Sequence, residues 1–244
     1  TLEKVAAALS PRTRLLVISH VSWKSGIVAP VAELAELVHQ RDGFLAVDGA
    51  QSAGAIPLDM QALGVDFYAL PGQKWLCGPE GVGALYVRRD RLSDLQQTYV
   101  GYPSMRDGLA HDDSGNFLAA SGAARYEVGT VYKPALVGMC AGLDWLASLG
   151  WDWIYSRVRA MTESCRARLS NIPGVTVTTG QDFAGLTCFR IDGVEPAQAV
   201  THLADRGVLI RSVSRPDLLR ASTSFFNDEA DLERLQAGVE ELLS

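Results

Sequence analysis

Short apolar runs alternate with helical segments in the first half of the chain, and this alternation limits the fold more than any other feature. Residues 30–41 have proline in the first turn and apolar residues at helical spacing, which predicts a helix. A shorter helix is predicted at 1–9, and strands at 14–19, 43–48, 66–70 and 83–89. Because their apolar residues are nearly continuous, such strands pair in parallel, with helices on the faces of the sheet.

The pattern changes after about residue 133. Residues 134–169 predict a long helical region broken near Gly150, short strands follow around a helix at 195–207, and a last helix is predicted from Asn227. We therefore expect an α/β fold, with a mainly parallel sheet flanked by helices and a smaller C-terminal α+β domain. The predicted divisions are a partial large domain, a connecting helical region and a small domain, at residues 1–133, 134–170 and 171–244. Because four strands make a thin sheet of this type, the front of the large domain is expected to lie outside this chain.

The charge and composition argue against several classes of function. The chain has 22 Lys and Arg against 28 Asp and Glu, a formal net charge of −6, so nucleic-acid binding is not expected. No apolar run is long enough to cross a membrane, and the first residues lack the pattern of a signal peptide. The four cysteines are widely spaced, which suits reduced thiols in the cytoplasm better than disulfides. Neither they nor the four histidines show metal-ligand spacing, so no metal site is predicted.

Two charged residues follow consecutive predicted strands. Asp48 ends the strand at 43–48, and Lys74 lies in the turn LPGQKWLCGPEG after the strand at 66–70. Taken alone, Asp48 is most simply a turn cap and Lys74 a surface residue. Ligands of open parallel sheets, however, bind beyond the carboxyl ends of the strands. A lysine at that rim would lose hydration, which lowers its pKa and favours a Schiff base with a carbonyl compound such as pyridoxal phosphate. That cofactor also needs an Asp partner for its pyridinium nitrogen, which Asp48 would provide.

Three other polar residues have both a structural and a functional interpretation. Arg211 and Arg220 fall on adjacent predicted strands, where they could form surface ion pairs or bind a substrate carboxylate. Thr130 precedes the long helical region and is either a loop residue or a phosphate ligand. The glycines at 78–83 are interpreted as turn residues, because this stretch lacks both the G-x-G-x-x-G and the G-K-[ST] pattern.

Two motifs carry a resemblance to a known family. They are D-G-A-Q at 48–51 and G-x-K-W followed by G-P-x-G-x-G at 72–83. With these motifs, residues 14–90 resemble the centre of the class V aminotransferase family of fold-type I pyridoxal-phosphate enzymes, and the likeness continues more weakly to the C-terminus. The resemblance implies an enzyme that acts on an amino acid as an aminotransferase, C–S lyase or epimerase. It also implies a homodimer with the active site at the subunit interface.

The resemblance assigns cofactor roles to individual residues. Lys74 would hold pyridoxal phosphate as a Schiff base and later move the substrate Cα proton. Asp48 would pair with the pyridine nitrogen, and Gln51 would hydrogen-bond the phenolic oxygen. Many family members have Ser and His at the positions of Pro71 and Gln73, where they help to hold the phosphate and the lysine. Gln73 is therefore expected at a cofactor-binding position, with its contacts changed.

The resemblance also bears on the substrate and on the dimer. Arg220 would bind the substrate α-carboxylate, and Thr130 would reach the phosphate of the neighbouring subunit's cofactor. Cysteine desulfurases of the family carry a catalytic Cys in a loop between the positions of Arg211 and Arg220, and this chain has none there. This favours the epimerase-like and cystine-lyase-like branch, in which Arg211 would hold a distal carboxylate.

The family's N-terminal segment supplies an aromatic residue that stacks on the cofactor ring and a phosphate-binding turn. It has no counterpart in these 244 residues. The alternative interpretation is therefore an inactive fragment, or a non-catalytic α/β binding module with a decayed cofactor site.

Overall fold

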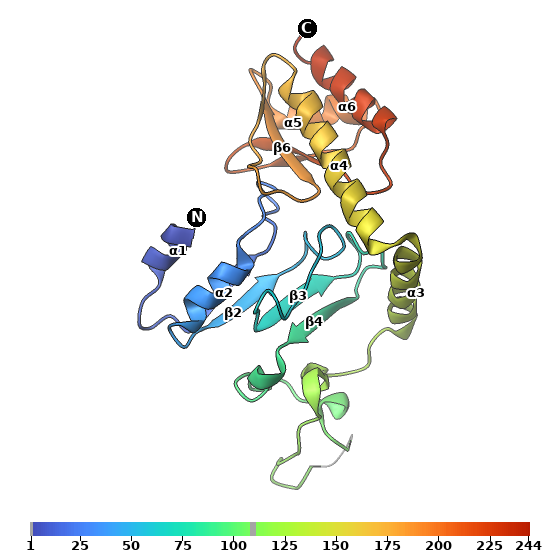
Figure 1. Cartoon of the computed structure of the whole chain (residues 1–244). Helices are drawn as coiled ribbons and strands as arrows, with labels where there is room; N and C mark the ends of the chain where they lie inside the picture. Colours follow the sequence, from blue (N-terminus) through green and yellow to red (C-terminus); the bar gives the residue numbers. More distant parts are fainter. Residues whose placement is uncertain (1, 108–110) are drawn as a thin grey trace.

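The computed structural model describes residues 2–107 and 111–244, and in these residues two four-stranded sheets form the framework (Figure 1). The first sheet has the order β1-β2-β3-β4, with bounds Leu15–Ser19, Phe44–Asp48, Phe67–Pro71 and Gly83–Val87. Strands β1, β2 and β3 are parallel, and β4 is antiparallel to β3. The predicted α/β fold with a mainly parallel sheet is confirmed.

The direction of β4 makes the sheet mixed, because β4 is the one strand of the four that runs antiparallel to its neighbour. Its connection to β3, residues 72–82, contains no helix and is closed by a hydrogen bond of 2.8 Å from the Gly72 N–H to the Val82 carbonyl. A parallel pair needs a crossover of about a dozen or more residues, usually a helix, whereas an antiparallel pair needs only a turn. The short turn therefore sets the pairing, and it carries Lys74 at the carboxyl end of β3.

Helix α2 (Val31–His39) covers one face of the first sheet, and α1 (Leu2–Ala8) packs on α2. The contact with the sheet buries Val31, Leu34, Ala35 and Val38 against Leu45, Val47 and Tyr68. On the other face, Val17 of β1 and Leu85 of β4 are 66% and 44% exposed. Because side chains alternate along a strand, Asp48 lies at the carboxyl end of this open face.

Helices α3 (Lys133–Leu149) and α4 (Trp151–Ser170) connect the two sheets. They separate at Gly150, as predicted, because its φ of 91° interrupts a right-handed helix. The second sheet is antiparallel, with the order β5-β6-β8-β7 and bounds Val175–Val177, Leu186–Ile191, Leu218–Ser222 and Arg211–Val213. Helices α5 (Pro196–Ala204) and α6 (Glu229–Glu241) pack with α4 against this sheet.

The last helix, α6, begins two residues later than the predicted start at Asn227. Asp228 is its N-cap, and the Asp228 carboxylate accepts a hydrogen bond of 3.0 Å from the Asp231 N–H. An N-cap residue has an extended backbone and stands outside the helix, so the acidic residues after Asn227 mark the cap as well as the first turn.

A core cluster between the two sheets fixes the turn after β3. Trp75 and Leu76 from that turn pack with Leu146 of α3, Ile154 of α4 and Leu186 of β6. All five side chains are at most 8% exposed. The carboxyl edge of the first sheet is thus packed directly against the second sheet and its connecting helices.

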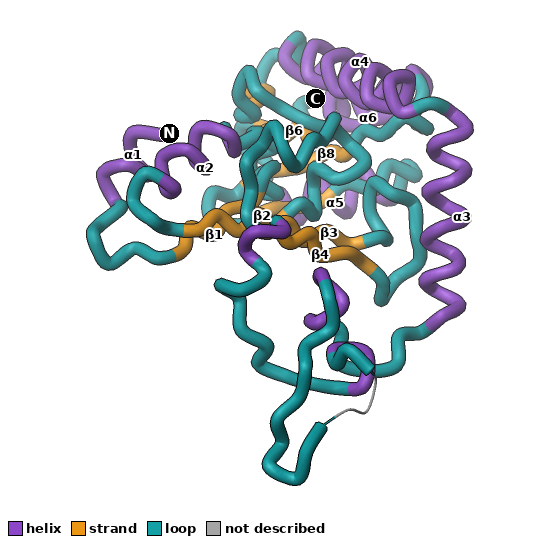
Figure 2. The backbone as a smooth tube through the Cα atoms, turned by 60° about the horizontal axis from the view of Figure 1, so that its bottom comes forward, coloured by secondary structure: helices purple, strands orange, loops and turns teal. Residues whose placement is uncertain are grey.

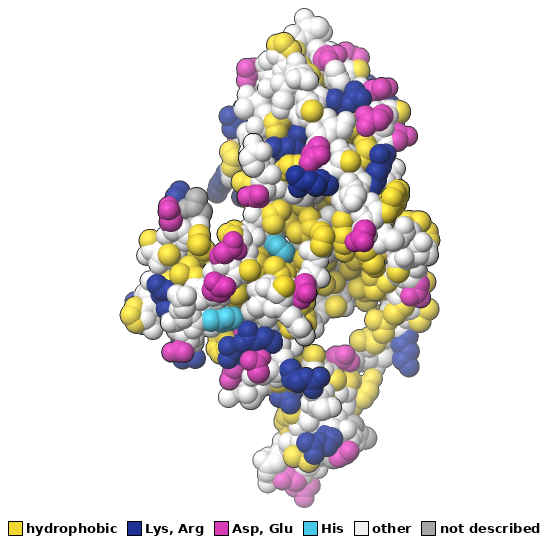
Figure 3. Space-filling model, viewed as in Figure 1, with side chains coloured by type: hydrophobic (Ala, Val, Ile, Leu, Met, Phe, Trp, Pro, Cys, Tyr) yellow, Lys and Arg dark blue, Asp and Glu magenta, His cyan; other side chains and the backbone are white. Residues whose placement is uncertain are grey.

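Residues 88–107 and 111–132 form an arm that extends from the end of β4 to the start of α3 (Figures 1 and 2). Its short 3-10 helices are Arg89–Arg91, Tyr102–Ser104 and Gly122–Tyr126. The arm exposes large hydrophobic side chains, including Tyr99 and Tyr132, and α3 exposes Val137. Figure 3 shows hydrophobic side chains gathered along α3.

Reduced cysteines and the lack of a membrane-spanning segment were both expected from the sequence. Cys77, Cys140, Cys165 and Cys188 are all unpaired. Within the described part of the chain, no helix is long and apolar enough to cross a membrane.

Candidate active site

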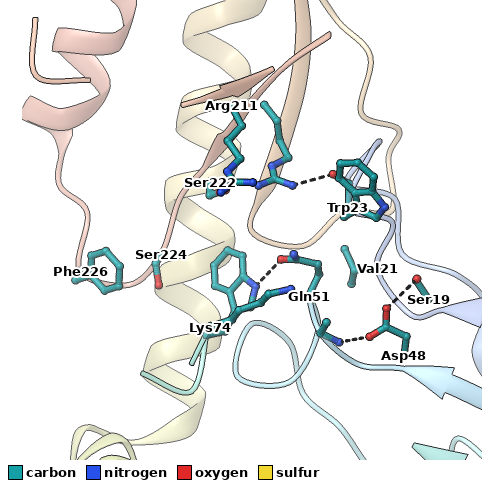
Figure 4. Close-up of a pocket in the computed structure, with 13 residues that line it drawn as sticks. Ser19, Val21, Trp23, Asp48, Gln51, Lys74, Arg211, Ser222, Ser224 and Phe226 are labelled. Carbon is teal, nitrogen blue, oxygen red and sulfur yellow. Dashed lines mark hydrogen bonds between the residues drawn. The ribbon is translucent and has the colours of Figure 1, made fainter. Parts of the chain in front are cut away.

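A cavity of about 490 Å³ opens between the carboxyl ends of the first sheet and the strands β7 and β8 of the second (Figure 4). Its walls come from the ends of β1 and β2, the turn after β3, and the second sheet. The lining residues are Ser19, Val21, Trp23, Asp48, Ala50, Gln51, Lys74, Trp75, Arg211, Arg220, Ser222, Ser224 and Phe226. Five of the predicted site residues therefore share one cavity, although 172 positions separate Asp48 from Arg220 in the sequence (220 − 48).

Asp48 combines the two roles that the sequence left open. Its Oδ1 accepts a hydrogen bond of 2.9 Å from the Ala50 N–H, so the side chain does cap the turn after β2. Its Oδ2 accepts one of 3.2 Å from the Ser19 hydroxyl at the end of β1. The carboxylate nevertheless stays exposed at the cavity wall. It can therefore cap the turn and face a ligand at the same time.

A buried network supports this turn from below. The Tyr68 hydroxyl lies 2.5 Å from the Ser52 hydroxyl and 2.9 Å from Nδ1 of His20. The backbone N–H of His20 also donates to the backbone carbonyl of Asp48 at 2.9 Å. A Cβ at Gly49 would overlap the Tyr68 ring, so only glycine fits there. Burial lowers the pKa of His20 to about 4 and raises that of Tyr68 to about 12, so both are neutral at pH 7.

The buried His20 is expected to make the fold sensitive to acid. In the unfolded chain His20 becomes protonated at the usual histidine pKa of 6.5. In the folded chain it becomes protonated only at about pH 4. The free energy of unfolding is therefore highest above pH 6.5. It falls as the pH is lowered, by up to about 3 kcal/mol near pH 4. Urea unfolding at pH values from 7 to 4 would measure this slope, which should be shallower in His20→Asn. Equal slopes in the two proteins would contradict the assignment.

Lys74 lies on the wall of this cavity and of a second hollow that Gln73 also lines. The prediction that this lysine is desolvated is wrong, because its side chain is exposed. The neighbouring residue, Trp75, is buried instead and anchors the turn. The backbone is held by a hydrogen bond of 2.8 Å from the Gly78 N–H to the Gly72 carbonyl. Lys74 is thus an exposed side chain on a turn that is anchored by its neighbour Trp75.

Arg211 and Arg220 stand opposite each other on the antiparallel strands β7 and β8. Nη1 of Arg220 donates to the Trp23 carbonyl at 3.1 Å, and its buried Nε has no hydrogen-bond partner among the described residues. Burial lowers the pKa of Arg220, and the positive charge of Arg211 lowers it further. Two adjacent guanidinium groups that repel each other at a cavity wall are a favourable site for an anion.

The comparisons with known proteins identify the family. A family model, aminotransferase class V, matches residues 1–235. The chain belongs to the class V aminotransferase family. The membership expected from the motifs at 48–51 and 72–83 is confirmed.

Relatives in the class V family carry several activities. The chain is 31% identical to a probable cysteine desulfurase of Halalkalibacterium halodurans, over 98% of this chain and 60% of that protein. It is 34% identical to the isopenicillin N epimerase of Amycolatopsis lactamdurans, over 98% of this chain and 63% of that protein. The chain thus spans about 60% of the length of these relatives.

Solved structures give a similar result. A mutant of C-DES with glycine covalently linked to its PLP cofactor superposes with a TM-score of 0.90 and 32% identity, covering 99% of this chain and 64% of that one. A complex of the cystine C–S lyase C-DES with its product, cysteine persulfide, superposes with a TM-score of 0.89 and 33% identity. The match covers 98% of this chain and 64% of that one.

Two residues to which the class V resemblance gave cofactor roles lie outside the main cavity. Thr130 is on the arm, where its hydroxyl lies 3.0 Å from the Tyr102 hydroxyl. Gln73 is exposed and lines the second hollow beside Lys74. Pro71 lines that hollow as well. The cavity is therefore lined by Asp48 and Lys74, and neither Thr130 nor Gln73 is among its lining residues.

Several residues that line the cavity were not predicted from the sequence. Trp23 follows the end of β1, so the rule that ligands bind beyond strand ends could have indicated it. Phe226 lies in the segment after β8 and is 69% exposed at the cavity wall. Trp75 belongs to the motif at 72–83, and its indole Nε1–H donates to Oε1 of Gln51 at 3.0 Å. No periodicity in the sequence indicates this contact.

Proposed function

We propose that the chain forms the pyridoxal-phosphate-binding part of an enzyme that acts on an amino acid, with Lys74 covalently bonded to the cofactor. The observation that carries the proposal is the meeting of Lys74, Asp48 and Arg220 at one cavity. An amine, a carboxylate and a guanidinium match the aldehyde, the ring nitrogen and a substrate carboxylate respectively. The PLP cofactor of the similar C-DES structure supports the same assignment.

The residues at the cavity fit such a cofactor chemically. Lys74 and the two arginines Arg211 and Arg220 face the cavity without an ion pair to any carboxylate in the described ranges. The unpartnered Nε of Arg220 is a buried donor that lacks an acceptor. Uncompensated positive charge and an orphaned donor both favour an anionic ligand over solvent. Asp48, on the opposite wall, supplies the one carboxylate among the lining residues.

Each residue has a defined part in the proposed reaction. Pyridoxal phosphate, when bound, supplies a ring that accepts the electron pair released when a substrate Cα bond breaks. Asp48 would keep the ring nitrogen protonated, since its carboxylate stabilises a neighbouring positive charge. Gln51 would hydrogen-bond the ring oxygen. Lys74 Nζ would take the proton from the substrate Cα and return it, while Arg220 orients the substrate α-carboxylate.

The pair of arginines supports a substrate with two carboxylates. Arg220 is suited to the α-carboxylate, and Arg211 is one strand away on the same wall. The turn that connects their strands, residues 214–217, contains no cysteine. Without a thiol there, sulfur transfer of the desulfurase kind has no acceptor on this loop. A C–S lyase or an epimerase acting on a cystine-like or dicarboxylic amino acid fits these features better.

The arm supports a homodimer that shares its active sites. Thr130 lies outside the cavity of its own chain, on an arm that exposes Tyr99 and Tyr132. Exposed hydrophobic surface of this kind is typical of protein interfaces. We propose that Thr130 contacts the cofactor phosphate of a second subunit.

The unpaired cysteines favour a reducing compartment such as the cytoplasm. We also propose domains at residues 1–133 and 171–244, connected by 134–170.

Borohydride reduction followed by peptide mapping tests the proposal. The protein purified in the presence of pyridoxal phosphate should carry the reduced cofactor on Lys74 and on none of its three other lysines. Product analysis with two-carboxylate amino acids then assigns the reaction. Pyruvate, ammonia and a persulfide from cystine indicate a lyase, keto acid with amino-group exchange indicates an aminotransferase, and inversion at Cα alone indicates an epimerase. A protein that takes up no cofactor would instead be the binding module or inactive fragment considered above.

A further inference from the structure

The orientation of the Gln51 side chain is fixed by a single neighbour. Nε1–H of Trp75 donates to Oε1 of Gln51 at 3.0 Å, the dashed line beside Gln51 in Figure 4. An indole nitrogen donates but cannot accept, so the oxygen of the amide must face Trp75. The Gln51 amide nitrogen has no protein partner in the described ranges and is left at the cavity. We propose that Trp75 is a positioning residue that holds Gln51 as a hydrogen-bond donor facing the cavity.

Trp75 is itself held rigidly from two sides. Its side chain is 8% exposed within the core cluster between the two sheets. A Cβ at Gly185, just before β6, would overlap the benzene ring of the indole. On the other side, a Cβ at Gly54 would come within 2.7 Å of the Trp75 backbone. The segment after β2 therefore confines the Trp75 backbone, and the residue before β6 confines its indole ring.

The direction of the amide decides what Gln51 can do. A carboxamide is a donor on one side and an acceptor on the other, and rotation by half a turn exchanges the two. A donor stabilises an anionic oxygen, whereas an acceptor repels it. If the proposed function holds, Gln51 faces the ring oxygen of the cofactor, and the contact with Trp75 keeps that oxygen in its anionic form. Trp75 would then influence the cofactor without touching it, by acting through Gln51.

A pH titration of the visible absorbance of the bound cofactor tests this inference. The ring oxygen shares a proton with the nitrogen that links the cofactor to Lys74. Without the donor, this proton is held more tightly. Trp75→Phe, which keeps a ring and removes the N–H, should therefore raise the midpoint of the absorbance titration by about one pH unit. Gln51→Ala should raise it at least as far, and the double variant should match Gln51→Ala alone. Trp151→Phe removes an indole packed on the same core cluster and should leave the midpoint unchanged.

The inference is overturned if Trp75→Phe leaves the midpoint in place, or if its effect adds to that of Gln51→Ala. A second measurement needs no cofactor. Of the five indole N–H signals in a proton–nitrogen NMR spectrum, the one that Trp75→Phe removes should move upfield in Gln51→Ala, because it loses its acceptor. A signal that does not move would contradict the contact itself. Failure to bind cofactor would refute the proposed function, while the NMR result would still decide the orientation of Gln51.

Discussion

Lys74→Ala is expected to remove the covalent link to pyridoxal phosphate and to lower turnover by about 10⁴-fold. The variant loses the amine that bonds to the cofactor aldehyde and the same amine as the base for the Cα proton, and a positioned base alone contributes about 10²- to 10⁴-fold. The side chain is exposed, so its loss leaves no buried cavity, and the fold should be unaffected. Absorbance spectra with and without borohydride, together with a turnover assay, measure the effect.

Lys133→Ala is the matched control for this experiment. Lys133 is an exposed lysine at the start of α3, outside the residues that line the cavity. It should keep both the visible band and the turnover of the unmodified protein. If Lys74→Ala kept a borohydride-stable label, the cofactor would be bonded to another lysine and the assignment would be wrong.

Asp48→Asn is expected to lower turnover by about 10²- to 10³-fold while leaving the fold intact. Asparagine keeps an oxygen that can accept the Ala50 N–H, so the turn after β2 stays capped. It removes the negative charge that would hold a proton on the cofactor ring nitrogen, and loss of one fixed electrostatic partner costs about this much. Kinetic assays combined with thermal unfolding separate the two roles of the side chain.

Asp59→Asn provides the comparison for Asp48→Asn. The Asp59 carboxylate also caps a turn, accepting hydrogen bonds from the Gln61 and Ala62 N–H groups at 2.9 and 3.0 Å, but it does not line the cavity. Its substitution should change neither turnover nor the spectrum. An Asp48→Asn protein with full turnover would show that the carboxylate serves only as a cap.

The edge of the sheet that bears the cavity was predictable from local patterns. Asp48 and Lys74 were expected together because each follows an apolar run, and the ends of parallel strands meet at one edge. The break at Gly150 was predictable for a similar reason, since one residue with a positive φ decides it. Both features depend on residues close together in the sequence.

Other features depend on contacts between distant segments. The antiparallel direction of β4 follows from the short connection at 72–82, and apolar composition alone does not report direction. The exposure of Lys74 depends on Trp75 taking the buried position next to it. The indole that bonds to Gln51 packs against Gly185, which precedes β6 and lies 110 positions after Trp75 (185 − 75). Patterns with a short period carry no information about such pairs.

The opposed positions of Arg211 and Arg220 have a consequence for how such a pocket can change. Backbone hydrogen bonds between β7 and β8 set the spacing of the two guanidinium groups, and the connecting turn at 214–217 does not. Residues can therefore be replaced or added at the tip of this hairpin without disturbing the charge pair. A slip of one residue in the strand pairing, by contrast, would turn one arginine to the opposite face of the sheet. Changes in the loop would therefore leave the charge pair in place, while a change of strand register would remove the proposed site for an anionic substrate group.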